Sequence, residues 1–129
     1  MNATATTTAT TAQELAERYI AAWNETDPAA RRALVDATWA EDGRYTDPLV
    51  AAEGRDAIDA TLGAVQAQFP GLVFRLGGPV DDHHDIARFT WELGPADGEA
   101  LVVGFDVLVA DAEGRIAQVL GFLDKVPSV

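Results

Sequence analysis

Hydrophobic side chains recur at helical spacing in the first part of the chain and predict two helices. Thr11 can cap the first helix with its hydroxyl while Glu14, three residues later, reaches back in a capping box. Asp27-Pro28 can start the second helix, which is expected to run toward Trp39, since aspartate is a favoured N-cap and proline suits the first helical position. The spacing places on the buried faces Leu15, Tyr19, Ala22 and Trp23, and then Ala30, Leu34 and Thr38.

A short strand and a third helix are predicted next. Residues 41–43 are expected to break the second helix, and residues 44–47 extend into Pro48, which disfavours helix in the residue before it. Asp47 is therefore predicted at the end of a short strand. The third helix is expected to end at Pro70, and its apolar stripe consists of Ile58, Leu62, Val65 and Phe69.

The second half of the chain has the pattern of a sheet. Four β-rich runs, at residues 72–76, 86–93, 100–110 and 116–123, are joined by short polar connections, which favours antiparallel hairpins. Because no βαβ alternation is present, we expect an α+β domain in which three N-terminal helices pack on a curved antiparallel sheet and form a cone-shaped pocket.

One domain accounts for this pattern. We expect it to cover residues 12–129, after a flexible tail at residues 1–11, because residues 1–10 contain only Met, Asn, Ala and Thr. A chain of 129 residues, 48% of them hydrophobic, is large enough to bury a core and an internal pocket.

Charge and composition remove several classes of function. The chain has 9 Lys and Arg against 21 Asp and Glu, a net charge of −12, whereas nucleic acids and anionic membranes select basic surfaces. Without cysteine, the chain has no disulfide and no thiolate metal site. No apolar stretch approaches the ~18 residues of a membrane helix, and no signal peptide is recognisable. We therefore expect a cytoplasmic protein that binds neither nucleic acid nor membrane.

Asp106 is the principal candidate for chemistry. It is the one ionisable residue in an apolar run, residues 101–110, that is predicted to be a buried strand. A buried carboxyl group either finds hydrogen bonds or remains protonated with a raised pKa. Strand alternation places Phe105, Val107 and Val109 on the opposite face, which also needs to be covered.

A metal site is not expected. His83 and His84 lie in the polar stretch Asp81–Asp85 between two predicted strands, where a solvated hairpin is favoured. Adjacent strand residues point to opposite faces, so the two imidazoles cannot readily converge on one ion. Neither a metal-binding motif nor a phosphate-binding loop is present elsewhere, and we expect no cofactor.

Three local segments and the order of elements resemble the nuclear transport factor 2-like (NTF2-like) superfamily, which includes SnoaL-like polyketide cyclases and Δ5-3-ketosteroid isomerases. The segments are residues 18–27 around Tyr19, residues 45–48 around Asp47, and residues 102–106 ending at Asp106. The resemblance covers roughly residues 12–126, and among these families the pattern is closest to that of the ketosteroid isomerases. Two departures are Leu62 and Trp39, which stand where those isomerases carry additional tyrosines.

The resemblance implies a role for each of the three residues. Asp47 would be the general base that removes a proton next to a ketone, while Tyr19 and a protonated Asp106 would stabilise the negative charge that develops on the carbonyl oxygen. The implied activity is a cofactor-independent, steroid delta-isomerase-like shift of a carbon–carbon double bond in a hydrophobic substrate. Because Asp47 lies at a water-accessible strand end and Asp106 among apolar neighbours, their pKa values are expected to differ in the required order.

Other interpretations of the same residues stay open. Tyr19 could be a core aromatic, Asp47 a turn-forming carboxylate, and Asp106 a buried partner of a neighbouring donor. The whole chain could instead be a SnoaL-like polyketide cyclase, or a non-catalytic module for binding small molecules or for dimerisation. The aromatic residues expected around a pocket are Trp23, Trp39, Tyr45, Phe69, Trp91 and Phe122. The resemblance also implies a homodimer formed through the sheet.

Overall fold

Three helices form one layer of the protein. In the computed structural model, which describes residues 11–127, they are α1 (Ala12–Asn24), α2 (Pro28–Thr38) and α3 (Arg55–Gln68). The predicted capping box is present, because Thr11 accepts the backbone N–H of Glu14 and the Glu14 carboxylate accepts the backbone N–H of Thr11. Residues 1–10 of the predicted tail lie outside the described residues, and Thr11 is the N-cap of α1.

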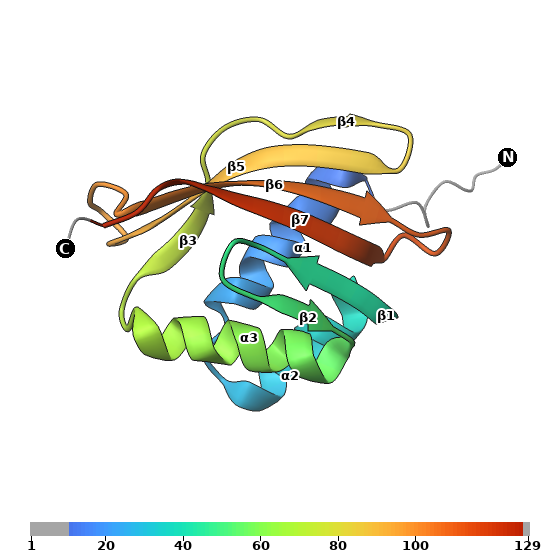
Figure 1. The fold of residues 1–129 in the computed structure, drawn as a ribbon, viewed down its shortest axis with the longest axis horizontal. Helices are drawn as coiled ribbons and strands as arrows, with labels where there is room; N and C mark the ends of the chain where they lie inside the picture. Colours follow the sequence, from blue (N-terminus) through green and yellow to red (C-terminus); the bar gives the residue numbers. More distant parts are fainter. Residues whose placement is uncertain (1–10, 128–129) are drawn as a thin grey trace, which may run out of the picture.

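The second layer is one sheet. Its strands are β1 (Trp39–Thr46), β2 (Ala51–Glu53), β3 (Val73–Leu76), β4 (Asp81–His83), β5 (Ile86–Gly94), β6 (Val102–Ala110) and β7 (Ile116–Lys125). The order is β2-β1-β7-β6-β5-β3, with β4 paired to β5. Figure 1 shows the three helices on one side of this sheet. The predicted α+β fold is therefore confirmed.

The sheet differs from the prediction in being mixed. Strand β1 runs parallel to β7, whereas the other pairings are antiparallel. Helix α2 ends at Thr38, and β1 begins at Trp39 and includes residues 41–43, whereas the short strand was expected to start at residue 44. Residues 41–43 by themselves favour a turn, but pairing with β7 extends the strand through them. The pairing accommodates these residues by a register shift between Trp39 and Arg44.

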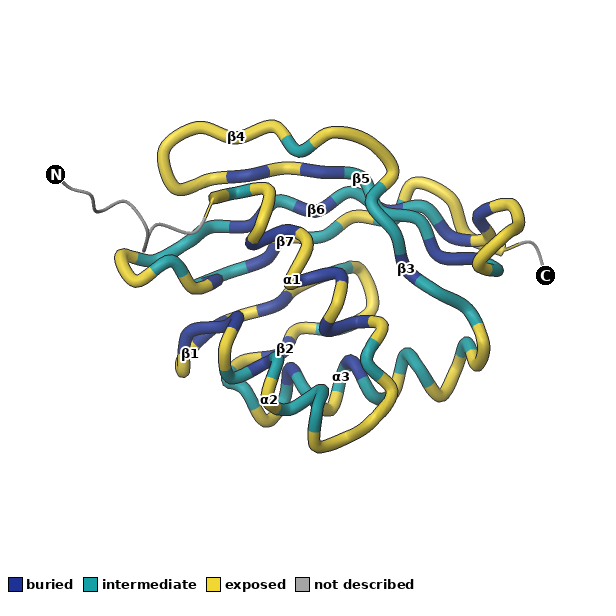
Figure 2. Tube along the Cα trace, turned by 180° about the vertical axis from the view of Figure 1, so that it is seen from behind, coloured by how far each residue is buried: buried dark blue, intermediate teal, exposed yellow. Residues whose placement is uncertain are grey.

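The polar stretch Asp81–Asp85 is the predicted hairpin. Strand β4 pairs with the start of β5, and His84 occupies the turn with a φ of 53°. Figure 2 shows this hairpin as exposed along one edge of the sheet. Among residues 11–127, no cluster of three or more His, Asp or Glu side chains could hold a metal ion. No helix in the same range is long and apolar enough to cross a membrane.

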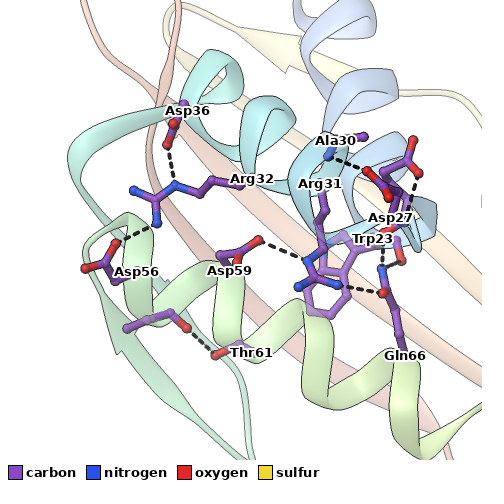
Figure 3. Close-up of polar contacts among 12 residues, drawn as sticks. Trp23, Asp27, Ala30, Arg31, Arg32, Asp36, Asp56, Asp59, Thr61 and Gln66 are labelled. Carbon is purple, nitrogen blue, oxygen red and sulfur yellow. Dashed lines mark hydrogen bonds and ion pairs between the residues drawn. The ribbon is translucent and has the colours of Figure 1, made fainter.

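A polar network joins the three helices behind the core. Arg31 on α2 donates to Asp59 and to the side-chain oxygen of Gln66, both on α3, and Gln66 donates to the backbone carbonyls of Trp23 and Glu25 at the end of α1. Figure 3 shows these contacts side by side with the more exposed pairing of Arg32 with Asp36 and Asp56. Because carbonyls at a helix end lack helical partners, Gln66 supplies the donor for two of them.

Candidate active site

A pocket opens between the helices and the inner face of the sheet. Its cavity volume is about 240 Å³, and its wall is largely apolar. The lining residues are Tyr19, Ile20, Trp23, Tyr45, Asp47, Leu49, Val65, Gln68, Phe69, Phe74, Trp91, Leu93, Val102, Asp106, Leu123, Val126 and Pro127. The three predicted catalytic residues, Tyr19, Asp47 and Asp106, therefore share one cavity.

Asp106 lies at the inner end of this pocket. Strand alternation turns it inward on β6, where it is 2% exposed, and the Tyr19 hydroxyl on α1 donates to its Oδ2 at 2.6 Å. Burial raises the pKa of Asp106 to about 6, and the nearby charge of Asp47 acts in the same direction, whereas the Tyr19 hydroxyl and the Trp91 indole N–H oppose the rise. A neutral carboxyl group is therefore accessible near neutral pH.

Tyr19 remains a proton donor in this environment. Burial raises its pKa well above the ordinary value for tyrosine, and the charge of Asp106 adds to the rise. Its ring packs edge-on against Trp23 and Phe89, with ring centroids 6.1 and 5.7 Å away. The hydroxyl is thus held at the pocket by a buried ring.

Asp47 lies nearer the pocket opening, directly after β1. Its Oδ1 accepts the backbone N–H groups of Leu49 and Val50 at 2.8 and 2.9 Å, and its Oδ2 accepts the Tyr45 hydroxyl at 2.6 Å. Asp47 is half-buried, whereas Asp106 is almost fully buried. The two carboxyl groups therefore occupy the different environments that the sequence predicted.

Gly121 on β7 lies between the two carboxyl groups. Strand β7 is paired with β1 on one side and β6 on the other, and Gly121 is directly opposite Asp106. A Cβ at position 121 would lie 2.8 Å from Oδ1 of Asp106 and 3.4 Å from Cβ of Asp47. The absence of a side chain here leaves room for both aspartates on the same pocket wall.

Four of the six predicted aromatic pocket residues line the cavity: Trp23, Tyr45, Phe69 and Trp91. The other two do not. Trp39 is fully buried behind the pocket, where it packs against Tyr19 and Tyr45 with ring centroids 6.0 and 6.5 Å away.

The assignment of Phe122 to the pocket is corrected for a different reason. Its side chain is 57% exposed, and it pairs with Phe105 on the outer face of the sheet. Strand alternation turns its neighbours Gly121 and Leu123 toward the cavity instead.

The sequence matches the model of the SnoaL-like domain family over residues 16–119. The chain belongs to this family. Among solved structures, this SnoaL-like domain is similar to a candidate isomerase of the SnoaL-like family from Agrobacterium tumefaciens, with 46% identity and a TM-score of 0.83 over 87% of this chain and 96% of that one. No curated protein matches the chain significantly.

More distant structures share the fold alone. A candidate SnoaL-like polyketide cyclase from Jannaschia sp. CCS1 has 18% identity and a TM-score of 0.67, over 95% of this chain and 92% of that one. An NTF2-like protein of unknown function from Cytophaga hutchinsonii has 13% identity and a TM-score of 0.68, over 92% and 95%. The NTF2-like architecture of this SnoaL-like domain is thus established independently of its chemistry.

Sequence reasoning missed several parts of the SnoaL-like site. Val102 could have been placed in the pocket, because it is four residues before Asp106 and so on the same strand face. Phe74, Leu93 and Gly121 carried no such signal, since their positions depend on strand pairing. The hydroxyl of Tyr45 was also missed, because the residue was interpreted only as an aromatic wall.

Asp47 and Asp106 also have structural roles at this site. Asp47 makes the turn-type contacts with Leu49 and Val50, and Asp106 has the hydrogen-bond partner that a buried carboxyl group requires. These contacts hold the side chains in place, and a structural role is compatible with a chemical one. Their location in an apolar cavity is what distinguishes the arrangement from an ordinary turn or core contact.

Proposed function

We propose that this SnoaL-like protein is an isomerase of the ketosteroid-isomerase type, which shifts a carbon–carbon double bond next to the ketone of a hydrophobic substrate. The observation that carries the proposal is the pair of carboxyl groups, one half-buried and one almost fully buried, on the same wall of an apolar pocket. Different surroundings suit the two carboxyl groups to different roles.

Each group then has a defined step. Oδ2 of Asp47 takes a proton from the carbon next to the ketone, and the electron pair moves through the enolate toward the carbonyl oxygen. The hydroxyl of Tyr19 and the neutral carboxyl of Asp106 donate hydrogen bonds to that oxygen. Asp47 returns the proton to the carbon at the far end of the double bond, so the reaction involves no net gain or loss of protons.

The composition of the pocket wall favours a neutral, apolar substrate. The lining residues named above include no Lys, Arg or His, and their charged members are the two aspartates. An anionic substrate would find no counter-charge there, and the net charge of −12 would repel it. Membership of the SnoaL-like family and the 46% identity to a candidate isomerase support the same class of chemistry.

A second candidate function is polyketide cyclisation. It is favoured by the SnoaL-like family match, and it begins with a similar removal of a proton next to a carbonyl group. Asp47 would again be the base, but the resulting carbanion would attack a second carbonyl of the same chain. Product analysis separates the two, because isomerisation leaves the carbon skeleton unchanged and cyclisation forms a new carbon–carbon bond.

Conversion of a β,γ-unsaturated 3-ketosteroid to its conjugated enone, followed by ultraviolet absorbance, tests the proposal. Wild type should turn over, whereas Asp47→Asn and Asp106→Ala should lose roughly 100-fold or more in kcat while remaining folded. Wild-type conversion at the rate of buffer would exclude steroid isomerisation. Full activity in Asp47→Asn would exclude the assigned base, and binding of the ketone without conversion would favour the non-catalytic interpretation.

A further inference from the structure

The carboxylate of Asp47 is held by three donors. Two of them are the backbone N–H groups of Leu49 and Val50, both on Oδ1, and the third is the Tyr45 hydroxyl, on Oδ2 at 2.6 Å. An ionised carboxylate offers about four lone-pair sites. Oδ1 is therefore fully used by the turn, and the site still available for a proton is on Oδ2.

Tyr45 is more deeply buried than Asp47, the residue that it contacts. Its side chain is 3% exposed, and its ring packs against Trp23 and Trp39 with centroids 5.5 and 6.5 Å away. Asp47, by contrast, is half-buried and directly follows the last residue of β1. The aromatic core thus holds the hydroxyl, and the hydroxyl holds Oδ2 while the two backbone N–H groups hold Oδ1.

The Tyr45 hydroxyl is also a permanent donor. Burial raises its pKa, and the charges of Asp106 and Asp47 and the hydrogen bond to Asp47 add to the rise, so the hydroxyl does not ionise near neutral pH. Both tyrosines of the chain therefore donate to an aspartate of the pocket: Tyr19 to Asp106, and Tyr45 to Asp47.

We infer that Tyr45 is a positioning residue for the reaction, which holds Oδ2 of Asp47 so that its one free lone pair is directed at the substrate carbon. The inference rests on the proposed function, in which Asp47 is the base. The role is distinct from that of Tyr19, because Tyr45 acts through its hydrogen bond to Asp47, whereas Tyr19 donates to Asp106 and, in the proposed reaction, to the carbonyl oxygen.

A double-mutant cycle tests this role with Tyr45→Phe, Asp47→Ala and the variant that combines them. The phenylalanine retains the ring and removes only the hydroxyl. Tyr45→Phe should lower kcat roughly 10- to 100-fold and change KM less than about twofold, since a misplaced base slows proton transfer more than it weakens binding. In the Asp47→Ala background, the same substitution should have no further effect on the residual rate.

Two results of the cycle would overturn the inference. One is a Tyr45→Phe variant with the kcat of wild type, and the other is an equal loss in the presence and absence of the Asp47 carboxylate. The second result would mean that Tyr45 acts independently of Asp47. Thermal unfolding of each variant shows whether a loss of rate reflects a loss of folded protein.

A proton NMR measurement tests the same contact without turnover. Short hydroxyl–carboxylate hydrogen bonds give strongly downfield resonances, so one such resonance should disappear in both Tyr45→Phe and Asp47→Ala, while that of Tyr19 remains. A spectrum that Asp47→Ala leaves unchanged would contradict the inference. Failure of the proposed function gives a different result. Wild type would then show no turnover, although the downfield resonance of the Tyr45–Asp47 hydrogen bond would still be present.

Discussion

At the scale of single residues, the chemistry depends on how the protein treats each carboxyl group. Asp106 contacts Tyr19 of α1 and Trp91 of β5, and burial raises its pKa to about 6. Because a carboxylic acid donates a hydrogen bond only in its protonated form, the proposed role of Asp106 depends on pH. Asp47, held by a turn and by Tyr45, is positioned to act as an acceptor.

The pH dependence of the isomerase reaction should therefore show the ionisation of Asp106. With a pKa of about 6, the donor is protonated below that pH, so kcat/KM should be higher there and fall about tenfold for each further pH unit above it. Asp106→Asn retains an N–H donor that does not ionise, and its profile should lack this decline. An unchanged decline in Asp106→Asn would assign the ionisation to another group.

Gly121 provides a steric test of the same site. In Gly121→Ala the new Cβ would lie 2.8 Å from Oδ1 of Asp106, closer than real contacts allow, so the carboxyl group must move. We expect kcat to fall roughly 10- to 100-fold. Gly78→Ala is the matched control, because a Cβ there meets nothing within 4 Å, and it should leave kcat unchanged. Equal kcat values for the two variants would contradict the claim that the missing side chain of Gly121 leaves room for the two aspartates.

At the scale of elements, the pocket depends on how the helices are fixed behind it. Trp23 forms part of the pocket wall and lies in the last turn of α1, whose terminal carbonyls accept from Gln66 on α3. Arg31 on α2 is bonded to Gln66 and Asp59, so all three helices meet in one network. This hydrogen-bond network, which we call the polar brace, therefore lies next to the apolar wall of the pocket.

Removing this brace should destabilise the protein measurably. Gln66→Leu retains a similar size but leaves the carbonyls of Trp23 and Glu25 without their donor, which we expect to lower the free energy of unfolding by about 1–3 kcal/mol. Arg32→Gln is the control, since it breaks the ion pairs with Asp36 and Asp56, whose side chains are 46% and 94% exposed, and it should cost less than about 1 kcal/mol. Urea unfolding measures both, and similar losses would show that the brace contributes nothing beyond a surface contact.

At the scale of the whole molecule, the three helices of residues 11–127 cover one face of the sheet and leave the other open. The outer face carries pairs of apolar side chains in register across β6 and β7, Phe105 with Phe122 and Val107 with Leu120. Phe122 is 57% exposed and Leu120 37% exposed. Contiguous apolar surface of this kind is typical of association, and the expectation of a homodimer therefore remains a proposal for this face.

A charge placed on the outer face should prevent association. Wild type is expected to sediment as a dimer at micromolar concentration, and Phe122→Asp as a monomer, because the aspartate would be buried without a partner in the interface. Leu49→Asp adds the same charge at a side chain that is 82% exposed and away from this face, and it should leave the dimer intact. A monomeric wild type would contradict the proposal.

Features set by neighbouring residues could be predicted from the sequence. Helix starts at Thr11 and Asp27 depend on side chains that cap backbone groups within three residues, and both are present as expected. The inward direction of Asp106 and the outward direction of Phe105 follow from strand alternation, which is a property of each strand alone. Local geometry therefore predicted the three helices, the fold class and the inward direction of Asp106, whereas the roles of Tyr19 and Asp47 were implied by the family resemblance.

The arrangement of the site required the tertiary structure. Tyr19 and Asp106, 87 residues apart, meet because α1 packs on the inner face of the sheet, and Asp47 joins them because β1 runs parallel to β7. Which strands pair is decided by the free energy of the whole sheet and its covering helices, and neighbouring residues do not encode it. The same reason explains why Trp39 lies behind the pocket and Phe122 on the outer face, and why the hydroxyl of Tyr45 reaches Asp47.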